Sequence, residues 1–293
     1  ILDQENSLSD GLIMSTFMKL NLRQWERTFV FICTVIGVTC FSTPVLAQGA
    51  AFTILTPENQ QRIEWAVWRY AVDKPLLMET IRWFREATRN SKEAAAVAQL
   101  SRLEFMKAQL EVDKNTRIQL FEQCVAIADR SLALNPDDVS GLFWKAAAMG
   151  KMAEDSGIVN ALKMLRPMEE MLLKVVALDE EYENAGGHRA LGRMYHKLPG
   201  FPISFGSNAK ALMHLKRAHA LFPKDIITRA FYAEVLFDEG KKEEARKHAD
   251  FVLATPIEEE DALEFAAYVD IALTIVKKTG GSDIKLSVTG SIH

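Results

Sequence analysis

The sequence predicts an all-α protein in which helical hairpins stack in series as an α-solenoid. Apolar residues recur with a period near 3.6 almost throughout residues 57–278. The chain of 293 residues has only 15 glycines and 9 prolines, and its many Ala, Leu, Met, Lys and Glu residues favour helices. Short breaks separate the periodic stretches, so consecutive helices are expected to fold back on one another.

Turn and cap residues mark where the expected helices begin and end. Pro75 begins a helix in its first turn, where proline fits. The segment 135–138, Asn-Pro-Asp-Asp, ends one helix and caps the next, and Gly240 lies where a left-handed helix end is wanted. The expected helices span residues 58–71, 75–90, 92–112, 114–134, 138–154, 157–178, 184–197, 207–221, 225–239, 242–254 and 258–278.

Composition and charge exclude several classes of protein. The chain is 48% hydrophobic and 25% charged, which excludes wholesale disorder and a polytopic membrane protein. Its net charge is −4 and both signs are interspersed, so nucleic acid is not an expected partner.

The N-terminal region has the three parts of a secretory signal peptide. Basic Lys19, Arg23 and Arg27 precede the uncharged stretch 29–41, and a small-residue exit follows that ends at Ala47. The uncharged stretch is too short for a transmembrane helix, which needs about 20 residues. The pattern predicts export to the periplasm with cleavage after Ala47.

The cysteines raise one alternative for the N-terminus and one expectation for the rest of the chain. A lipid anchor at Cys40 is the less favoured alternative, because residues 37–39 lack the leucine and the small residue that such sites show. Cleavage after Ala47 leaves Cys124 as the one cysteine, so no internal disulfide is expected. Its apolar helical surroundings favour a buried structural thiol over a nucleophile.

A repeat search finds units that resemble the tetratricopeptide repeat (TPR). Within residues 186–256, two successive units agree in the order and spacing of their small, large and turn residues, beginning with Leu191-Gly192-x-x-Tyr195. Earlier units end at Pro136 and near Asp179. Small residues let paired helices approach closely, and a Pro-rich or Asp-rich corner leads into the next repeat. The chain is therefore expected to be a TPR-type α-solenoid with a C-terminal capping helix.

One stretch is more particular than a generic repeat. Over about residues 95–256 the chain resembles the TatT family of periplasmic TPR proteins associated with TRAP transporters, through Gly186-Gly187, Leu191-Gly192-Arg193 and the Pro-containing insertion 199–206. More distantly it is similar to the regulator-of-microtubule-dynamics family. The resemblance implies a helical, exported, non-enzymatic protein that engages a transporter's solute-binding protein or its small organic-acid ligand.

No catalytic or metal-binding pattern stands out, so no enzyme activity, metal or cofactor is expected. None of the six histidines has His-x-x-x-His spacing or a neighbouring second ligand type. Gly186-Gly187 lacks the lysine and the preceding strand of a phosphate-binding loop, and we expect it to form a turn that resets the repeat phase.

Two surfaces are candidates for partner binding. The first helices of TPR hairpins line a groove, where we expect a basic cluster and an apolar floor; the alternative is an ordinary solvated basic face. The insertion places three large apolar residues in a loop, which either packs back onto the helices or contacts a partner. The groove residues are Arg102, Phe105, Phe143, Arg189, Arg193, His196, Lys197, Glu234 and Phe237, and the loop residues are Phe201, Ile203 and Phe205.

The combined prediction is an exported, non-catalytic TPR scaffold that binds a protein partner in the cell envelope, with peripheral or no membrane association. The alternatives are a carrier of a small organic anion in the groove and a BamD-like envelope-assembly module, and oligomerisation stays open. The expected segments are 1–17 (upstream extension), 18–47 (signal peptide), 48–91 (N-terminal helix pair), 92–257 (repeats), 258–279 (capping helix) and 280–293 (flexible tail).

Overall fold

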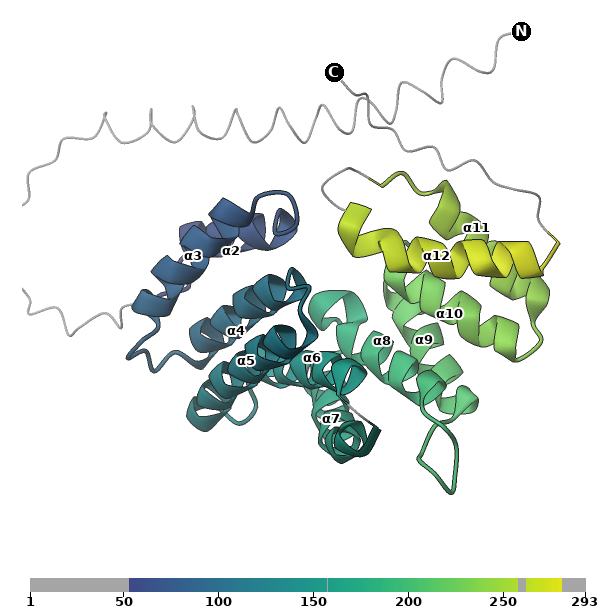
Figure 1. Cartoon of the computed structure of the whole chain (residues 1–293), viewed down its shortest axis with the longest axis horizontal. Coiled ribbons are helices and arrows are strands. Elements are labelled where there is room, and N and C mark those ends of the chain that lie inside the picture. Colours follow the sequence, from purple (N-terminus) through teal and green to yellow (C-terminus); the bar gives the residue numbers. More distant parts are fainter. Residues whose placement is uncertain (1–52, 157, 258–261, 281–293) are drawn as a thin grey trace, which may run out of the picture. The chain divides into compact units, whose positions relative to one another are not determined.

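The computed structural model describes residues 53–156, 158–257 and 262–280, and all regular structure in these ranges is helical (Figure 1). The expected signal peptide (18–47), the alternative lipid site at Cys40 and residues 281–293 of the expected tail lie outside them. The helices are α2 (Pro57–Trp68), α3 (Lys74–Ala87), α4 (Ala94–Gln109), α5 (Lys114–Leu134), α6 (Val139–Asp155), α7 (Ile158–Leu178), α8 (Tyr182–Lys197), α9 (Asn208–Leu221), α10 (Ile226–Asp238), α11 (Lys242–Ala254) and α12 (Ala262–Lys278).

The expected helices are confirmed, and their ends follow from the residues that predicted them. Asp138 caps α6 by accepting a hydrogen bond from the amide of Gly141 at 2.6 Å. Pro75 lies in the first turn of α3. Gly240 adopts a φ of +77° between α10 and α11, which glycine tolerates at a helix end.

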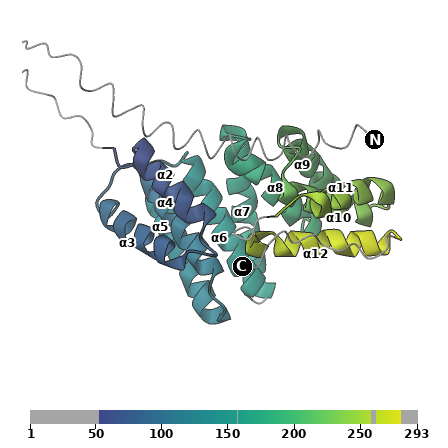
Figure 2. The same cartoon turned by 90° about the horizontal axis from the view of Figure 1, so that it is seen from above.

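The helices form two rows that follow the chain order seen in Figure 2. Helices α2, α4, α6, α8, α10 and α12 each contact the next along one row, which we call the first-helix row. Helices α3, α5, α7, α9 and α11 form the second-helix row, and each packs between the two helices that flank it in sequence. This is the hairpin stacking expected of an α-solenoid.

Small residues set how closely the rows approach each other. A Cβ placed on Gly192 of α8 would lie 2.5 Å from Cγ of the fully buried Leu215 of α9. Ala211 and Ala218 of α9 are also fully buried. The predicted packing role of the Leu191-Gly192 pair is confirmed.

The Gly186-Gly187 prediction was wrong, because both glycines are buried inside helix α8. A Cβ on Gly186 would lie 2.7 Å from the ring of Phe143, so this position requires glycine for packing. The turn lies just before them, where Glu183, Asn184 and Ala185 adopt φ values of 51°, 55° and 59°.

Cys124 is a free, fully buried thiol on α5, as predicted. Its sulfhydryl donates to the carbonyl of Leu120 at 3.2 Å. Burial raises the pKa of the thiol well above its usual value, so the reactive thiolate is suppressed.

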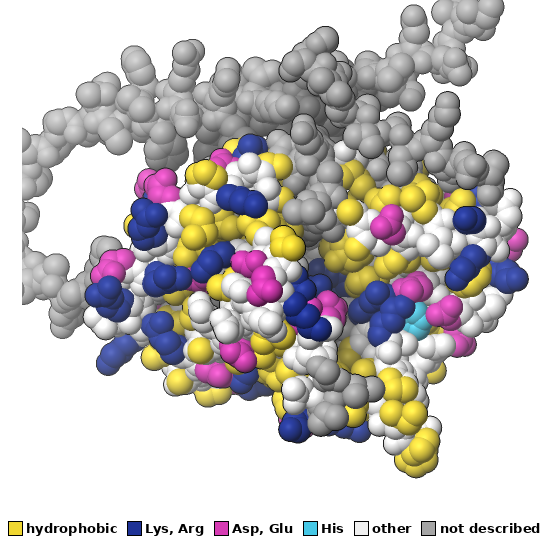
Figure 3. Space-filling view, in the orientation of Figure 1, with side chains coloured by type: hydrophobic (Ala, Val, Ile, Leu, Met, Phe, Trp, Pro, Cys, Tyr) yellow, Lys and Arg dark blue, Asp and Glu magenta, His cyan; other side chains and the backbone are white. Residues whose placement is uncertain are grey.

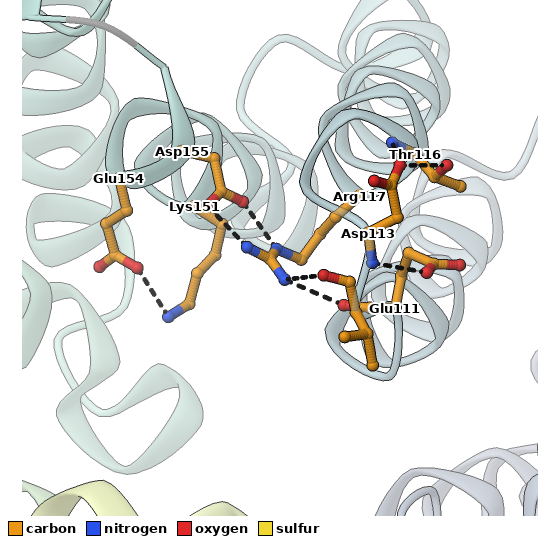
Figure 4. A network of polar contacts seen from close by, with 8 residues as sticks. Glu111, Asp113, Thr116, Arg117, Lys151, Glu154 and Asp155 are labelled. Atoms are coloured by element: carbon orange, nitrogen blue, oxygen red, sulfur yellow. Dashed lines mark hydrogen bonds and ion pairs between the residues drawn. The ribbon is translucent and has the colours of Figure 1, made fainter.

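Ion pairs connect consecutive hairpins, and the network around Arg117 is an example (Figure 4). Nε and Nη2 of Arg117 on α5 donate to the two carboxylate oxygens of Asp155 on α6, at 2.6 and 2.7 Å. Nη1 of the same guanidinium donates to the carbonyl of Glu111 at 3.0 Å and so closes the turn before α5. Within the described part of the chain, no helix is both long enough and apolar enough to cross a bilayer.

Candidate functional site on the first-helix row

The predicted basic cluster lies on the face of α8 that meets α10. Arg193 and Lys197 are one helical turn apart, so both side chains reach the carboxylate of Glu234 on α10. Lys197 donates to Glu234 Oε1 at 2.5 Å, and the Arg193 guanidinium lies 4.3 Å from the ring centroid of Phe231. The next residue along the face, His196, lies 2.8 Å from a carboxylate oxygen of Asp238. Figure 3 shows basic, acidic and histidine side chains together over these helices.

The charges of this face are matched. The pKa of the Glu234 carboxyl is lowered: burial acts to raise it, but the hydrogen bond from Lys197 and the charge of Arg193 outweigh burial. Glu234 is therefore ionised at neutral pH between two cations. Arg189, at the start of the same face, has its own carboxylate in Asp225 at 3.3 Å. Each predicted cation on α8 thus already has an acidic partner.

Arg189 also holds the left-handed turn that precedes α8. Its Nη1 donates to the carbonyl of Asn184 at 3.1 Å and its Nη2 to that of Glu183 at 3.2 Å. Left-handed backbone costs an L-residue about 1–2 kcal/mol, and it persists only where the surroundings impose it. Arg189 is therefore a structural clamp on the turn.

A second group of polar side chains, centred on the buried Arg102, lies where α2, α4, α6 and α8 meet. Arg102 on α4 is 8% exposed, donates to Glu64 at 2.5 Å and lies 3.3 Å from a carboxylate oxygen of Glu183. Its guanidinium carbon is 5.6 Å from the ring centroid of Trp144. Burial raises the pKa of the Glu183 carboxyl, while the charge of Arg102 opposes the rise. Arg102 thus joins the left-handed turn to earlier hairpins.

The nine predicted groove residues separate into four groups, the last of which is the buried pair Phe105 and Phe143. Five of them, Arg189, Arg193, His196, Lys197 and Glu234, are brought together between α8 and α10. Arg102 lies apart, at the second group of polar side chains described above. Phe237 is partly buried beneath Lys278, whose Nζ lies 5.5 Å from the ring centroid.

The expectation that Phe105 and Phe143 line the groove was wrong. Phe105 and Phe143 are buried in the largest apolar cluster, where both rings pack on Trp144 at centroid distances of 5.2 and 5.1 Å. Their rings are buried against other aromatic rings of the cluster and so do not form an exposed apolar floor.

One part of the insertion loop packs back onto the helices, and another part is exposed. Phe205 packs back: its ring lies 6.1 Å from that of Tyr195 and 4.0 Å from the Arg166 guanidinium. Phe201 and Ile203, by contrast, are 94% and 68% exposed.

Two histidine contacts were missed by sequence reasoning. Nδ1 of His188 on α8 lies 2.8 Å from Nδ1 of His214 on α9, and both residues are buried. His219 on α9 and His248 on α11 have ring centroids 4.9 Å apart. No group of three or more His, Cys, Asp and Glu side chains in the described ranges could hold a metal ion.

The contacts between hairpins share a sequence signal that was available beforehand. Partners in adjacent first-row helices are separated by 38 residues for Arg102 and Glu64, 41 for Arg193 and Glu234, and 37 for Lys197 and Glu234. These separations are close to one repeat length. A scan for opposite charges one repeat apart would have found these pairs.

A comparison with one solved structure agrees with this architecture. Among solved structures, a thermophilic TPR protein of Thermus thermophilus is 18% identical, with a TM-score of 0.53, and the match covers 74% of this chain and 99% of that one. The TPR protein YrrB, described as having an unusual peptide-binding site, is 18% identical with a TM-score of 0.41, over 67% and 90% of the two chains. No curated protein matches the sequence.

A family profile matches most of the described chain. The profile of the TRAP transporter T-component, TAtT, matches residues 72–269, which extend from the loop before α3 into α12. The match includes the left-handed turn at residues 183–185. It also includes the matched-charge face, by which we mean Arg189, Arg193, His196 and Lys197 of α8 with their acidic partners along α10 and at its N-cap. The chain therefore belongs to the TRAP transporter T-component family.

Proposed function

We propose that this chain is a non-catalytic TPR scaffold of a TRAP transport system and that it binds the solute-binding protein of that system in the periplasm. Its membership of the T-component family carries the proposal. The TPR architecture supports it, since repeat arrays commonly offer extended surfaces to protein partners. Periplasmic placement rests on the predicted signal peptide with cleavage after Ala47.

The matched-charge face between α8 and α10 is the proposed contact surface. Arg193, Lys197 and Glu234 present alternating charge beside the ring of Phe231. Protein interfaces combine such polar contacts with aromatic anchors. A small anion would have to displace Glu234 from both cations, so the pairing favours a protein surface over the anion-carrier alternative.

The exposed tip of the insertion loop is a second proposed contact. Phe201 and Ile203 are exposed, while Phe205 fixes the base of the loop against Tyr195 and Arg166. Because the base of the loop is held in place, its apolar tip loses little conformational entropy when it enters a partner's pocket.

Photo-cross-linking in cells tests the proposed partner and surface together. A photoreactive amino acid is placed at Lys197 on the proposed face, at Phe201 on the loop, and at Lys247 on α11 as the control. We expect the TRAP solute-binding protein to be cross-linked from the first two positions and not from Lys247. Equal cross-linking from all three, or none from any, would contradict the proposal.

A further inference from the structure

A cavity of about 610 Å³ opens on the second-helix row, between α9 and α11 and above Tyr232 of α10. Its volume lies within the range of small-molecule sites. The face between α8 and α10 belongs to the other row, so this cavity is separate from the surface proposed above.

One wall of the cavity consists of aromatic rings. The ring centroid of His248 is 4.7 Å from that of Tyr232 and 4.9 Å from that of His219. Burial lowers the pKa of both histidines, that of His248 to about 4, and the charge of Arg229 lowers them further. The wall is therefore uncharged at neutral pH. Nδ1 of His219 is buried without a hydrogen-bond partner among the described residues.

The rest of the lining and the rim have different chemistry. Leu212 and Met213 add apolar surface on α9. Lys216 and Lys241 are exposed at the rim, and none of the described side chains forms an ion pair with either ammonium group. Glu244 contributes one negative charge, which leaves the rim with a net charge of +1. The cavity thus combines apolar and aromatic walls with two free cations at its opening.

We propose that this cavity binds a small aromatic carboxylate, with the ring against His219, Tyr232 and His248 and the carboxylate at Lys216 and Lys241. An aromatic ring gains stacking and apolar burial from the walls. The lysines supply charge-assisted contacts to a carboxylate. Glu244 disfavours a second negative charge on the ligand, so the proposal is for a monoanion. The site goes beyond the proposed function and does not require the protein partner.

Calorimetric titration of the purified protein with 2-naphthoate tests the proposal, with 2-naphthamide and acetate as comparison compounds. We expect saturable binding of 2-naphthoate and much weaker binding of the uncharged amide and of the ringless anion. The double variant K216Q/K241Q should bind 2-naphthoate about tenfold more weakly, since two exposed charge contacts are lost. The control K242Q/K247Q removes the same charge from α11 outside the cavity and should bind within about twofold of wild type.

NMR spectra locate the bound ring independently of affinity. On addition of 2-naphthoate, the ring resonances of His219 and His248 should shift, whereas those of His196 should not. Absence of binding up to about 10 mM, equal affinity for the amide, or an unchanged affinity in K216Q/K241Q would overturn the proposal. Shifts confined to His196 would also overturn it, because they would place the ligand on the first-helix row.

Discussion

Replacement of Arg189 by alanine separates a structural from a binding role for this residue. The side chain is 16% exposed and donates to the carbonyls of Asn184 and Glu183 and to the carboxylate of Asp225. Removal of an ordinary exposed charge would leave folding nearly untouched. The structure predicts otherwise, because the substitution releases a three-residue left-handed turn.

The size of the effect follows from these contacts. Hydrogen bonds that involve a charged group contribute about 1.5–3 kcal/mol each, and less where solvent reaches them. Two bonds to carbonyls and one weaker ion pair therefore give a loss of about 2–4 kcal/mol in the free energy of unfolding. For a chain of this size, that loss lowers Tm by roughly 4–16 °C.

Urea denaturation followed by circular dichroism measures this difference. Lys197→Ala is the matched control, because its ammonium lies on the same face but its side chain is 45% exposed and has one partner. We expect the control to lose less than about 1 kcal/mol. If Arg189→Ala and Lys197→Ala were equally stable, the clamp would be refuted and Arg189 would return to the group of binding residues.

Three further predictions follow from packing and burial. Gly192→Ala should lower the free energy of unfolding by about 1–2 kcal/mol, because the new Cβ meets buried Leu215. Gly150→Ala meets only the tip of Met168 and should be neutral or stabilising in the same denaturation assay. Equal effects of the two substitutions would refute the packing argument. Cys124 should react with a thiol reagent only on unfolding, and fast labelling of the native protein would contradict its burial. Burial lowers the pKa values of His214 and His248 to about 4, below their unfolded values near 6.5. The contribution of these two histidines to stability should therefore be full above pH 6.5 and decline as the pH falls toward 4. A constant Tm across this window would contradict the prediction.

The sequence carried enough information to place the helices but less to place the site. Periodicity and caps such as Asp138 and Gly240 located the helices, since these signals act within a few residues. The left-handed turn was not foreseeable, because glutamate and alanine do not favour that conformation and contacts from distant helices impose it. The local sequence also suggested a free basic cluster, because the acids that pair with Arg193 and Lys197 lie one repeat further along the chain.

The distribution of glycines shows how packing can override local preference. Gly186-Gly187 has the composition of a turn, yet both residues are part of α8. Glycine is needed there because a Cβ on Gly186 would meet the ring of Phe143, and one on Gly187 would meet the side chains of Val175 and Val176. Phe105 and Phe143 occupy positions of the expected groove face, yet burial of their rings with Trp144 is worth more than exposure. Reading such positions correctly requires the distance between neighbouring helices, which only the three-dimensional structure supplies.

A calorimetric titration of residues 48–293 with the solute-binding protein of the TRAP system tests most directly whether the face between α8 and α10 binds this partner. We predict a saturable one-to-one complex, a loss of at least about tenfold in affinity for Lys197→Glu, and no change for the α11 control Lys247→Glu. The Lys197 side chain is 45% exposed and has one ionic partner, so reversal of its charge should leave the fold intact. Absence of a complex with the wild-type chain, or equal affinity for all three proteins, would contradict the claim that the face between α8 and α10 binds this partner.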